Sequence, residues 1–111
     1  MAQQTAVTIA SATTTLIGIV KKQRGLDIWR GSIGVAGTFG GTTVTFSWSP
    51  DGGTTKHPIT TAPGTSVSIT AATSFNIELG AGDKNSDGIL LYATTTGGAG
   101  ISITVQVVDN N

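Results

Sequence analysis

The feature that most constrains this chain is a strict alternation of apolar and polar side chains between Thr42 and Ser49. The apolar set is Val44, Phe46 and Trp48, and the polar set is Thr43, Thr45 and Ser47. Successive side chains of a β-strand point to opposite faces, so this pattern predicts a half-buried strand. A turn signal, Pro50-Asp51-Gly52-Gly53, follows at once, because proline sets the first corner and Asp-Gly tolerates positive φ. The segment predicts an all-β, hairpin-rich protein.

Similar extended segments recur along the whole chain. They are predicted at residues 16–20, 26–35, 54–60, 66–71, 74–79, 88–95 and 101–107, with glycine-rich turns between them. Gly31 and Gly34 suggest a bulge or bend in the second of these, and Pro58 confines the third to a sheet edge because proline cannot donate to a ladder. About seven to eight short antiparallel strands without a helical period indicate a single β-sandwich, jelly-roll-like or immunoglobulin-like.

Alternation also predicts which side chains fill the core of this sandwich. They are Ile17, Ile19, Leu26, Ile28, Val44, Phe46, Trp48, Val67, Ile69, Phe75, Ile77, Leu79, Leu91, Ile101, Ile103 and Val105.

The length of 111 residues suits one domain. Residues 1–15 have few apolar anchors and predict either a loose N-terminal arm that orders on docking or a weak first strand around residues 6–10. Residues 16–111 form the predicted sandwich. Charged residues are only 11% of the chain, against about 25% in typical domains, so its polarity comes from Thr, Ser and Gly.

The net charge of zero and the absence of cysteine exclude several classes of function. A nucleic-acid-binding protein needs many basic groups to neutralise phosphates. Disulfide frameworks and thiolate metal sites need cysteine. The first residues lack a signal-peptide pattern, and the apolar run Leu16–Val20 is too short to span a membrane, so we expect synthesis and folding in the cytoplasm. A neutral surface is poorly protected against self-association, and it is tolerable if much of it is buried in a larger assembly.

A possible cation loop lies at Asp83-Lys84-Asn85-Ser86-Asp87-Gly88. Oxygen ligands at Asp83, Asn85 and Asp87, with a glycine for the turn, match the first half of a calcium-binding loop. The second half does not match, because Thr94 stands where a bidentate Glu is expected. The same residue types also build ordinary hairpin connections. Calcium is therefore one interpretation, and a turn without a ligand is the other.

A basic cluster suggests a contact surface. Four of the six basic residues, Lys21, Lys22, Arg24 and Arg30, could meet an acidic partner. A solvated turn is the simpler explanation and the one we favour. Trp29 is out of phase with the inward apolar positions of its segment. It is therefore the one aromatic residue that we consider for a partner or ligand site.

The sequence gives no indication of an enzyme. His57 is the single histidine, and no nucleophile motif accompanies it. Glu78 is the only glutamate and lies between two apolar positions, so it is expected to face solvent. No glycine stretch has the spacing of a phosphate-binding loop. We predict no catalytic residues and no cofactor apart from the calcium alternative.

The segments Gly37–Thr45, with the sequence GTFGGTTVT, and Ser49–Thr55, with the sequence SPDGGTT, carry a resemblance. Together with a glycine-spaced turn and the C-terminal strand from Gly97 to Val107, they resemble small structural proteins of tailed bacteriophages, of the head-decoration or head-fibre type. The resemblance implies a virion component that is oligomeric and binds major capsid or neighbouring structural proteins. From the zero net charge and the short apolar runs described above, we expect no binding to nucleic acid or membrane.

The sequence therefore favours a non-enzymatic capsid-decorating subunit, made in the host cytoplasm and assembled into the virion. The alternative is a carbohydrate- or receptor-binding module of a fibre or tail, which would use an exposed Trp29 or Tyr92. A small hydrolase that uses His57 is a third, less favoured hypothesis.

Overall fold

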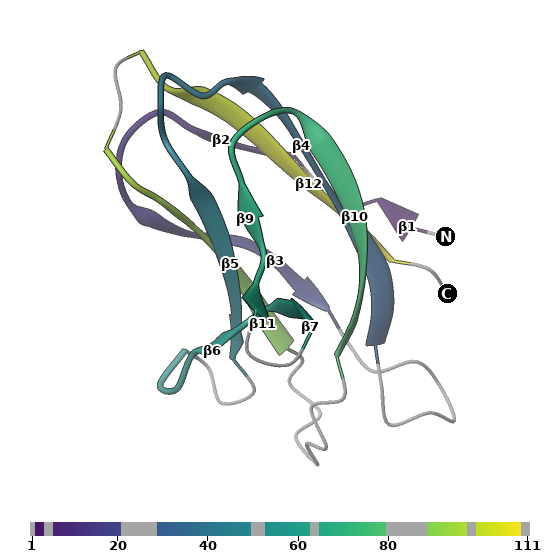
Figure 1. Ribbon diagram of the computed structural model, residues 1–111. Helices are drawn as coiled ribbons and strands as arrows, with labels where there is room; N and C mark the ends of the chain where they lie inside the picture. Colours follow the sequence, from purple (N-terminus) through teal and green to yellow (C-terminus); the bar gives the residue numbers. More distant parts are fainter. Residues whose placement is uncertain are drawn as a thin grey trace.

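The computed structural model describes residues 2–3, 6–20, 29–49, 53–62, 65–79, 89–97 and 100–109. These residues form β-strands, turns and bends, and no helix occurs among them. The strands build two facing sheets with the core between them (Figure 1). The all-β sandwich predicted from the alternation is confirmed.

Each sheet contains strands from both halves of the chain. Sheet A consists, in spatial order, of β1 (Ala2–Gln3) with β2 (Val7–Ile9), β12 (Ser102–Asp109), β4 (Trp29–Thr38) and β10 (Thr73–Leu79). Sheet B consists of β3 (Thr14–Val20), β11 (Ile89–Thr95), β5 (Val44–Ser49), and the edge pieces β6 (His57–Pro58) and β9 (Ser68–Ile69). A separate small hairpin joins β7 (Thr60–Ala62) to β8 (Thr65–Ser66).

The strand pairing is nested, with the start of the chain paired to its end. β1 and β2 pair with β12, β3 with β11, β4 with β10, and β5 with β6, all antiparallel. Successive strands β2, β3, β4 and β5 alternate between the two sheets, as a long hairpin does when it is wrapped into a barrel-like sandwich. This is the jelly-roll arrangement. The immunoglobulin-like alternative is wrong, because there the last two strands share a sheet, whereas β11 lies in sheet B and β12 in sheet A.

The core follows the two-residue period of the strands. Along β11, buried and half-buried residues alternate without interruption. Nine of the predicted core residues are buried: Ile17, Val44, Phe46, Val67, Ile77, Leu91, Ile101, Ile103 and Val105. Three more pack against the core while partly buried: Trp48, Ile69 and Phe75. Leu26, Ile28 and the side chain of Leu79 lie outside the described residues.

The structure adds core residues that alternation alone did not assign. They are Ile9, Val20, Ile33, Val35, Phe39, Ile59, Ile89, Ala93 and Val107.

The prediction that Ile19 points inward is wrong. Ile17 is 2% exposed and Ile19 is 49% exposed, whereas Val20 is again 2% exposed. The register between β3 and β11 explains this, because Gly18 is opposite Leu91 but Leu16 is opposite the next residue, Tyr92. Ile17 is therefore the extra residue of a β-bulge. A bulge shifts the phase of all later side chains, so Val20 takes the inward position that simple alternation gives to Ile19.

Gly31 and Gly34 suggested a bulge or bend, and the structure has no bulge at either residue. Both residues continue the register of β4 with β10 and β12 without a shift. β4 extends to Thr38, three residues beyond the predicted end at Val35.

At the start of the chain, the structure contains the weak first strand that was one of two alternatives. Val7–Ile9 pairs with β12, with Ile9 opposite Ile103. The docking role of an arm up to Thr15 stays a prediction. Pro58 lies in the edge segment β6, as expected, but the predicted strand 54–60 is reduced to this two-residue piece followed by β7.

Glycines make the connection between β4 and β5 possible. Gly40 and Gly41 have φ of 58° and 87°, and the Thr42 amide donates to the Phe39 carbonyl at 2.9 Å. Positive φ at both central positions is the mark of a tight type I′ turn. Gly37 has φ of 123°, and a Cβ atom at this position would lie 2.1 Å from the Ser102 carbonyl oxygen. The close approach of β4 to β12 therefore requires glycine at residue 37.

Gly37→Ala is expected to destabilise the fold strongly. The positive φ alone costs about 1–3 kcal/mol, and the clash with the Ser102 backbone adds to it. Gly34→Ala is the matched control in the same strand, because a Cβ there meets nothing within 4 Å. Urea unfolding should show a large loss for the first variant and little or no loss for the second. Equal losses would contradict the described path of β4.

The bulge predicts unequal costs for two neighbouring isoleucines. Ile17→Ala should lower the free energy of unfolding by about 2–5 kcal/mol, because it opens a cavity in the core. Ile19→Ala should change it by about 0.5 kcal/mol or less, as expected for an exposed side chain. Denaturant midpoints measure both variants, and a regular strand with Ile19 inward would give two similar, large losses.

Candidate docking surfaces

The outer face of sheet B carries a group of apolar side chains, here called the sheet B patch: Leu16, Ile19, Leu90 and Tyr92. Leu16 is opposite Tyr92 and Ile19 is opposite Leu90 across the β3–β11 pair, so the four side chains share one face. Leu16 is 43% exposed and Ile19 is 49% exposed, and they are the exposed large hydrophobic residues of the described chain. Leu90 and Tyr92 are half-buried.

Residues 53–56, which precede β6, lie at one end of the sheet B patch. The Gly53 amide donates to the Ser49 hydroxyl at 2.8 Å, which ties this segment to the end of β5. Gly53 has φ of 98°, a conformation that favours glycine, and a Cβ there would also lie 2.7 Å from the Tyr92 hydroxyl oxygen. The Lys56 ammonium lies 4.9 Å from the centre of the Tyr92 ring, in a cation–π arrangement. The patch therefore combines an apolar centre with a positive charge at its border.

The outer face of sheet A has a different character. A shallow hollow of about 500 Å³ lies over β4, where Gly34 and Ala36 carry almost no side chain. Small or uncharged residues of the neighbouring strands β10 and β12, together with Ala72 just before β10, form its walls. They are Ala72, Thr73, Ser74, Thr104 and Gln106. This face presents hydroxyl and amide groups without a charge at its centre.

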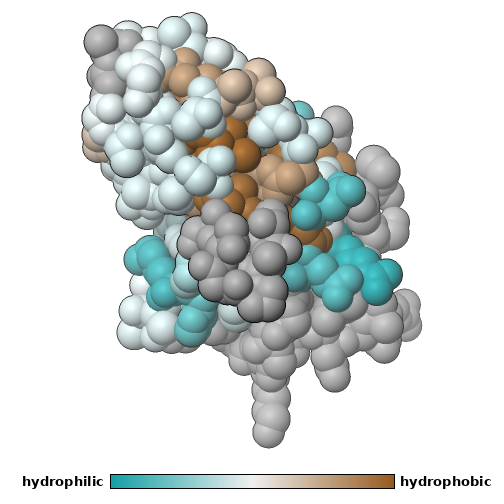
Figure 2. Space-filling model, viewed as in Figure 1, coloured by the Kyte–Doolittle hydropathy of each residue, from teal (hydrophilic) through white to brown (hydrophobic). Residues whose placement is uncertain are grey.

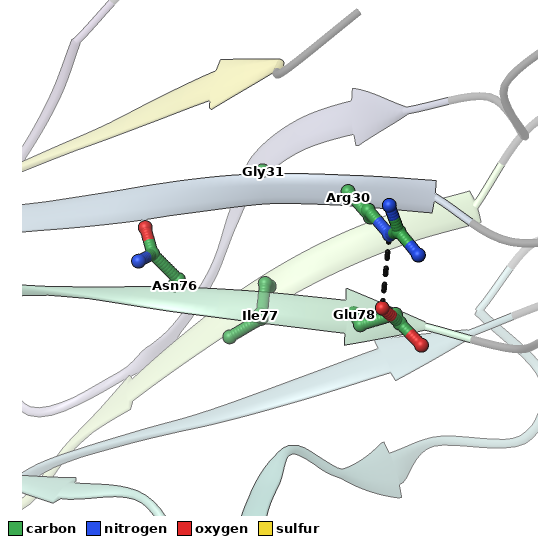
Figure 3. A pocket seen from close by; sticks show the side chains of 5 residues that line it. All are labelled: Arg30, Gly31, Asn76, Ile77 and Glu78. Carbon is green, nitrogen blue, oxygen red and sulfur yellow. Dashed lines mark hydrogen bonds and ion pairs between the residues drawn. The ribbon is translucent and has the colours of Figure 1, made fainter.

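Arg30, one of the predicted contact residues, lies at the start of β4 beside a second hollow of about 290 Å³. Its Nε donates to Oε2 of Glu78 at 2.9 Å across the β4–β10 pair, and the two side chains are 55% and 57% exposed. Figure 3 shows these two side chains meeting over the strands, while Ile77 points to the opposite side. Glu78 thus faces solvent, as the sequence predicted, and one basic charge of the predicted cluster is matched locally.

The other residues predicted from the sequence for a contact surface or a metal site lie outside the described residues. They are Lys21, Lys22, Arg24, Asp83, Asn85 and Asp87. Trp29 is the first residue of β4 and is opposite Leu79, but its side chain is likewise outside the described set. Among the described residues, no group of three His, Asp or Glu side chains is placed to hold a metal ion.

The remaining aromatic side chains mostly serve packing. The Phe46 and Phe75 rings are 5.2 Å apart in a tilted arrangement inside the sandwich. Trp48 is partly buried and lies 4.8 Å from the ring of His57. His57 thus contacts an indole at the edge of sheet B.

Some threonines lie in the interior, where their hydroxyl groups form hydrogen bonds to the backbone of distant segments. The Thr95 hydroxyl donates to the Ser11 carbonyl at 2.7 Å and accepts from the Thr13 amide at 3.0 Å, which fixes the link between β2 and β3. The Thr42 hydroxyl donates to the Thr96 carbonyl at 2.5 Å. This bond joins the turn between β4 and β5 to the residue after β11. Thr95 and Thr42 are both buried, so the threonine-rich composition is partly a feature of the interior.

The sheet B patch was missed by sequence reasoning for an identifiable reason. Leu16 follows the alternation with Ile17 inward and could have been assigned outward. Ile19 could not, because its exposure depends on the bulge.

Comparisons of the chain with protein-family models, with curated proteins and with solved structures gave no match. The described residues contain no helix that is long and apolar enough to cross a membrane.

The Arg30–Glu78 pair is expected to contribute little to stability. Arg30→Gln should lower the free energy of unfolding by less than about 1 kcal/mol, because both groups are more than half exposed and water screens their attraction. Glu78→Gln is the matched variant, and the double variant completes a thermodynamic cycle. A coupling well above 1 kcal/mol would show that this pair is a structural clamp rather than a surface contact.

Proposed function

We propose that the chain is a non-enzymatic structural subunit of a bacteriophage particle, which decorates or stabilises the capsid by binding other capsid proteins. The observation that carries this proposal is the sheet B patch. Two aliphatic side chains are left almost half exposed on a flat sheet face, in a chain with few charges. Contiguous exposed apolar groups of this kind mark interaction surfaces.

The surrounding chemistry supports a protein partner. Leu16, Ile19 and Leu90 offer aliphatic contact area, and Tyr92 adds a ring with a polar end, a residue type enriched at interfaces. Lys56 lies at the border of the patch, where a charge steers association at little cost. A capsid surface with an apolar strip beside an acidic residue would fit this arrangement.

Fold and sequence agree with the same role. The jelly roll is an architecture that viral capsid domains and lectins share. The Gly-rich segment behind the resemblance to phage head-decoration proteins forms the type I′ turn at Phe39–Thr42 and the close approach at Gly53. These glycines have a structural reason to be where they are. Fold alone does not fix function, so the surface chemistry carries the proposal.

The alternative of a glycan-binding module receives no specific support from the described aromatic residues. The Lys56 ammonium lies 4.9 Å from the centre of the Tyr92 ring, so a sugar that stacks on this ring face would have to displace it. The hollow over β4 is lined by hydroxyl and amide groups without an aromatic side chain.

The proposal is tested with purified chain and with phage particles assembled from the encoding genome without this gene product. Wild-type chain should bind the particles at saturable sites. Ile19→Lys and Leu16→Lys should each weaken binding at least about tenfold, equivalent to about 1.4 kcal/mol, because they place a charge in the patch.

Ser102→Lys is the matched control, since residue 102 is exposed on β12 of the opposite sheet. It should bind as wild type does. No binding of the wild-type chain, together with its absence from complete particles by mass spectrometry, would overturn the proposed function. Equal weakening by all three variants would overturn the assignment of the patch.

A further inference from the structure

The sheet edges of this sandwich are not equally protected against pairing with another chain. An exposed edge strand offers unpaired N–H and C=O groups, and natural proteins block such edges with short strands, bulges or proline. One edge of sheet A is formed by β1 and β2, which have only two and three residues. One edge of sheet B, β3, contains the bulge at Ile17, and the other is made of the two-residue pieces β6 and β9, with Pro58 in β6.

β10 at the remaining edge has none of these features. It has seven residues, and its register with β4 runs unbroken from Thr73 to Leu79. It contains neither proline nor lysine, and no described strand pairs with its other side. Figure 1 shows it as a long strand at the margin of sheet A. β10 is thus the one regular edge among the four edges of sheets A and B in the described part of the chain.

Apolar surface accompanies this edge. Phe75 in the middle of β10 is only half-buried although its ring packs on Phe46, and Ile69 in β9 is also half-buried. In Figure 2 the hydrophobic surface gathers between β9 and β10, where the two sheets meet at the open side of the sandwich. A neighbour that extends sheet A beyond β10 would cover this surface.

We propose that β10 pairs antiparallel with β10 of a second copy of this chain, across a two-fold axis at Asn76. Pairing by a two-fold axis keeps inward residues opposite inward residues only when a residue, not a peptide bond, lies near the axis. With Asn76 there, all seven residues of both strands are paired. Any other centre leaves part of the strand unpaired.

This register gives favourable side-chain pairs. Phe75 of each copy lies opposite Ile77 of the other copy. The dimer therefore contains two aromatic–β-branched pairs of the kind that stabilises sheets. Ser74 lies opposite Glu78, and Asn76 lies opposite itself, where two amides can exchange hydrogen bonds. The two Glu78 residues are about 14 Å apart along the strands, beyond the Debye length of about 8 Å. Each is also neutralised by its own Arg30 at 2.9 Å.

The proposed pairing of β10 depends on the proposed capsid role in one respect only, because that role leads us to expect that copies of the chain associate. Its test uses the purified chain alone, whereas the proposed function is tested by binding to particles. A monomer that still binds particles would overturn only the β10 pairing, and a dimer that does not bind would overturn only the capsid role.

Cysteine cross-linking tests the axis directly, because the chain has no cysteine of its own. Opposed residues of antiparallel strands have Cα atoms about 4.5–5.5 Å apart, within the about 4.4–6.8 Å that a disulfide spans. Under mild oxidation, Asn76→Cys should give mainly covalent dimer on a non-reducing gel. Ser102→Cys, exposed on β12 in the same sheet but away from the edge, should stay mainly monomeric.

Light scattering after size exclusion tests the association without a cross-link. The wild-type chain and Ser102→Lys should have the mass of a dimer, and Asn76→Lys should be a monomer with an unchanged circular dichroism spectrum, because two ammonium groups would meet at the axis. A monomeric wild-type chain, a dimer that persists in Asn76→Lys, or equal cross-linking of the two cysteine variants would each overturn the proposal.

Discussion

The structure depends on the pairing of β12 with strands from the other end of the chain. β12 lies between β4 on one side and β1 with β2 on the other, and its inward residues Ile103, Val105 and Val107 are fully buried. Each of these contacts closes a loop that spans most of the sequence. Since loop-closure entropy must be overcome before such contacts form, we expect this jelly roll to fold slowly compared with a helical domain of similar length.

The nested pairing also explains the distribution of small residues. Where the chain crosses between sheets, glycines and buried threonines take the place of longer side chains. Gly37 lets β4 approach β12, Gly40 and Gly41 form the tight turn into β5, and Thr95 bonds the link between β2 and β3. The centre of the outer face of sheet A carries Gly, Ala, Ser, Thr and Gln residues, with the Arg30–Glu78 pair at one end, and the outer face of sheet B carries a cluster of larger apolar side chains.

The alternation of Val44, Phe46 and Trp48 was sufficient to predict an all-β sandwich with one buried face per strand. It could not separate the jelly-roll from the immunoglobulin-like arrangement, because strand order depends on pairings between distant residues such as Ile9 and Ile103. It also placed Ile19 in the core, since a bulge leaves no local signal in the sequence. The sheet B patch depends on that same bulge. Asp83, Asn85 and Asp87 remain a prediction from sequence.

Native-state hydrogen exchange of the β12 amides tests the central claim, that long-range closure around β12 holds the sandwich together. If the claim is right, the amides from Ile103 to Val107 exchange only through global unfolding, with an opening free energy equal to the stability measured by denaturant. Exchange of these amides as fast as that of the short edge segments β6 and β9 would show that β12 is not the closing strand, and would contradict the account.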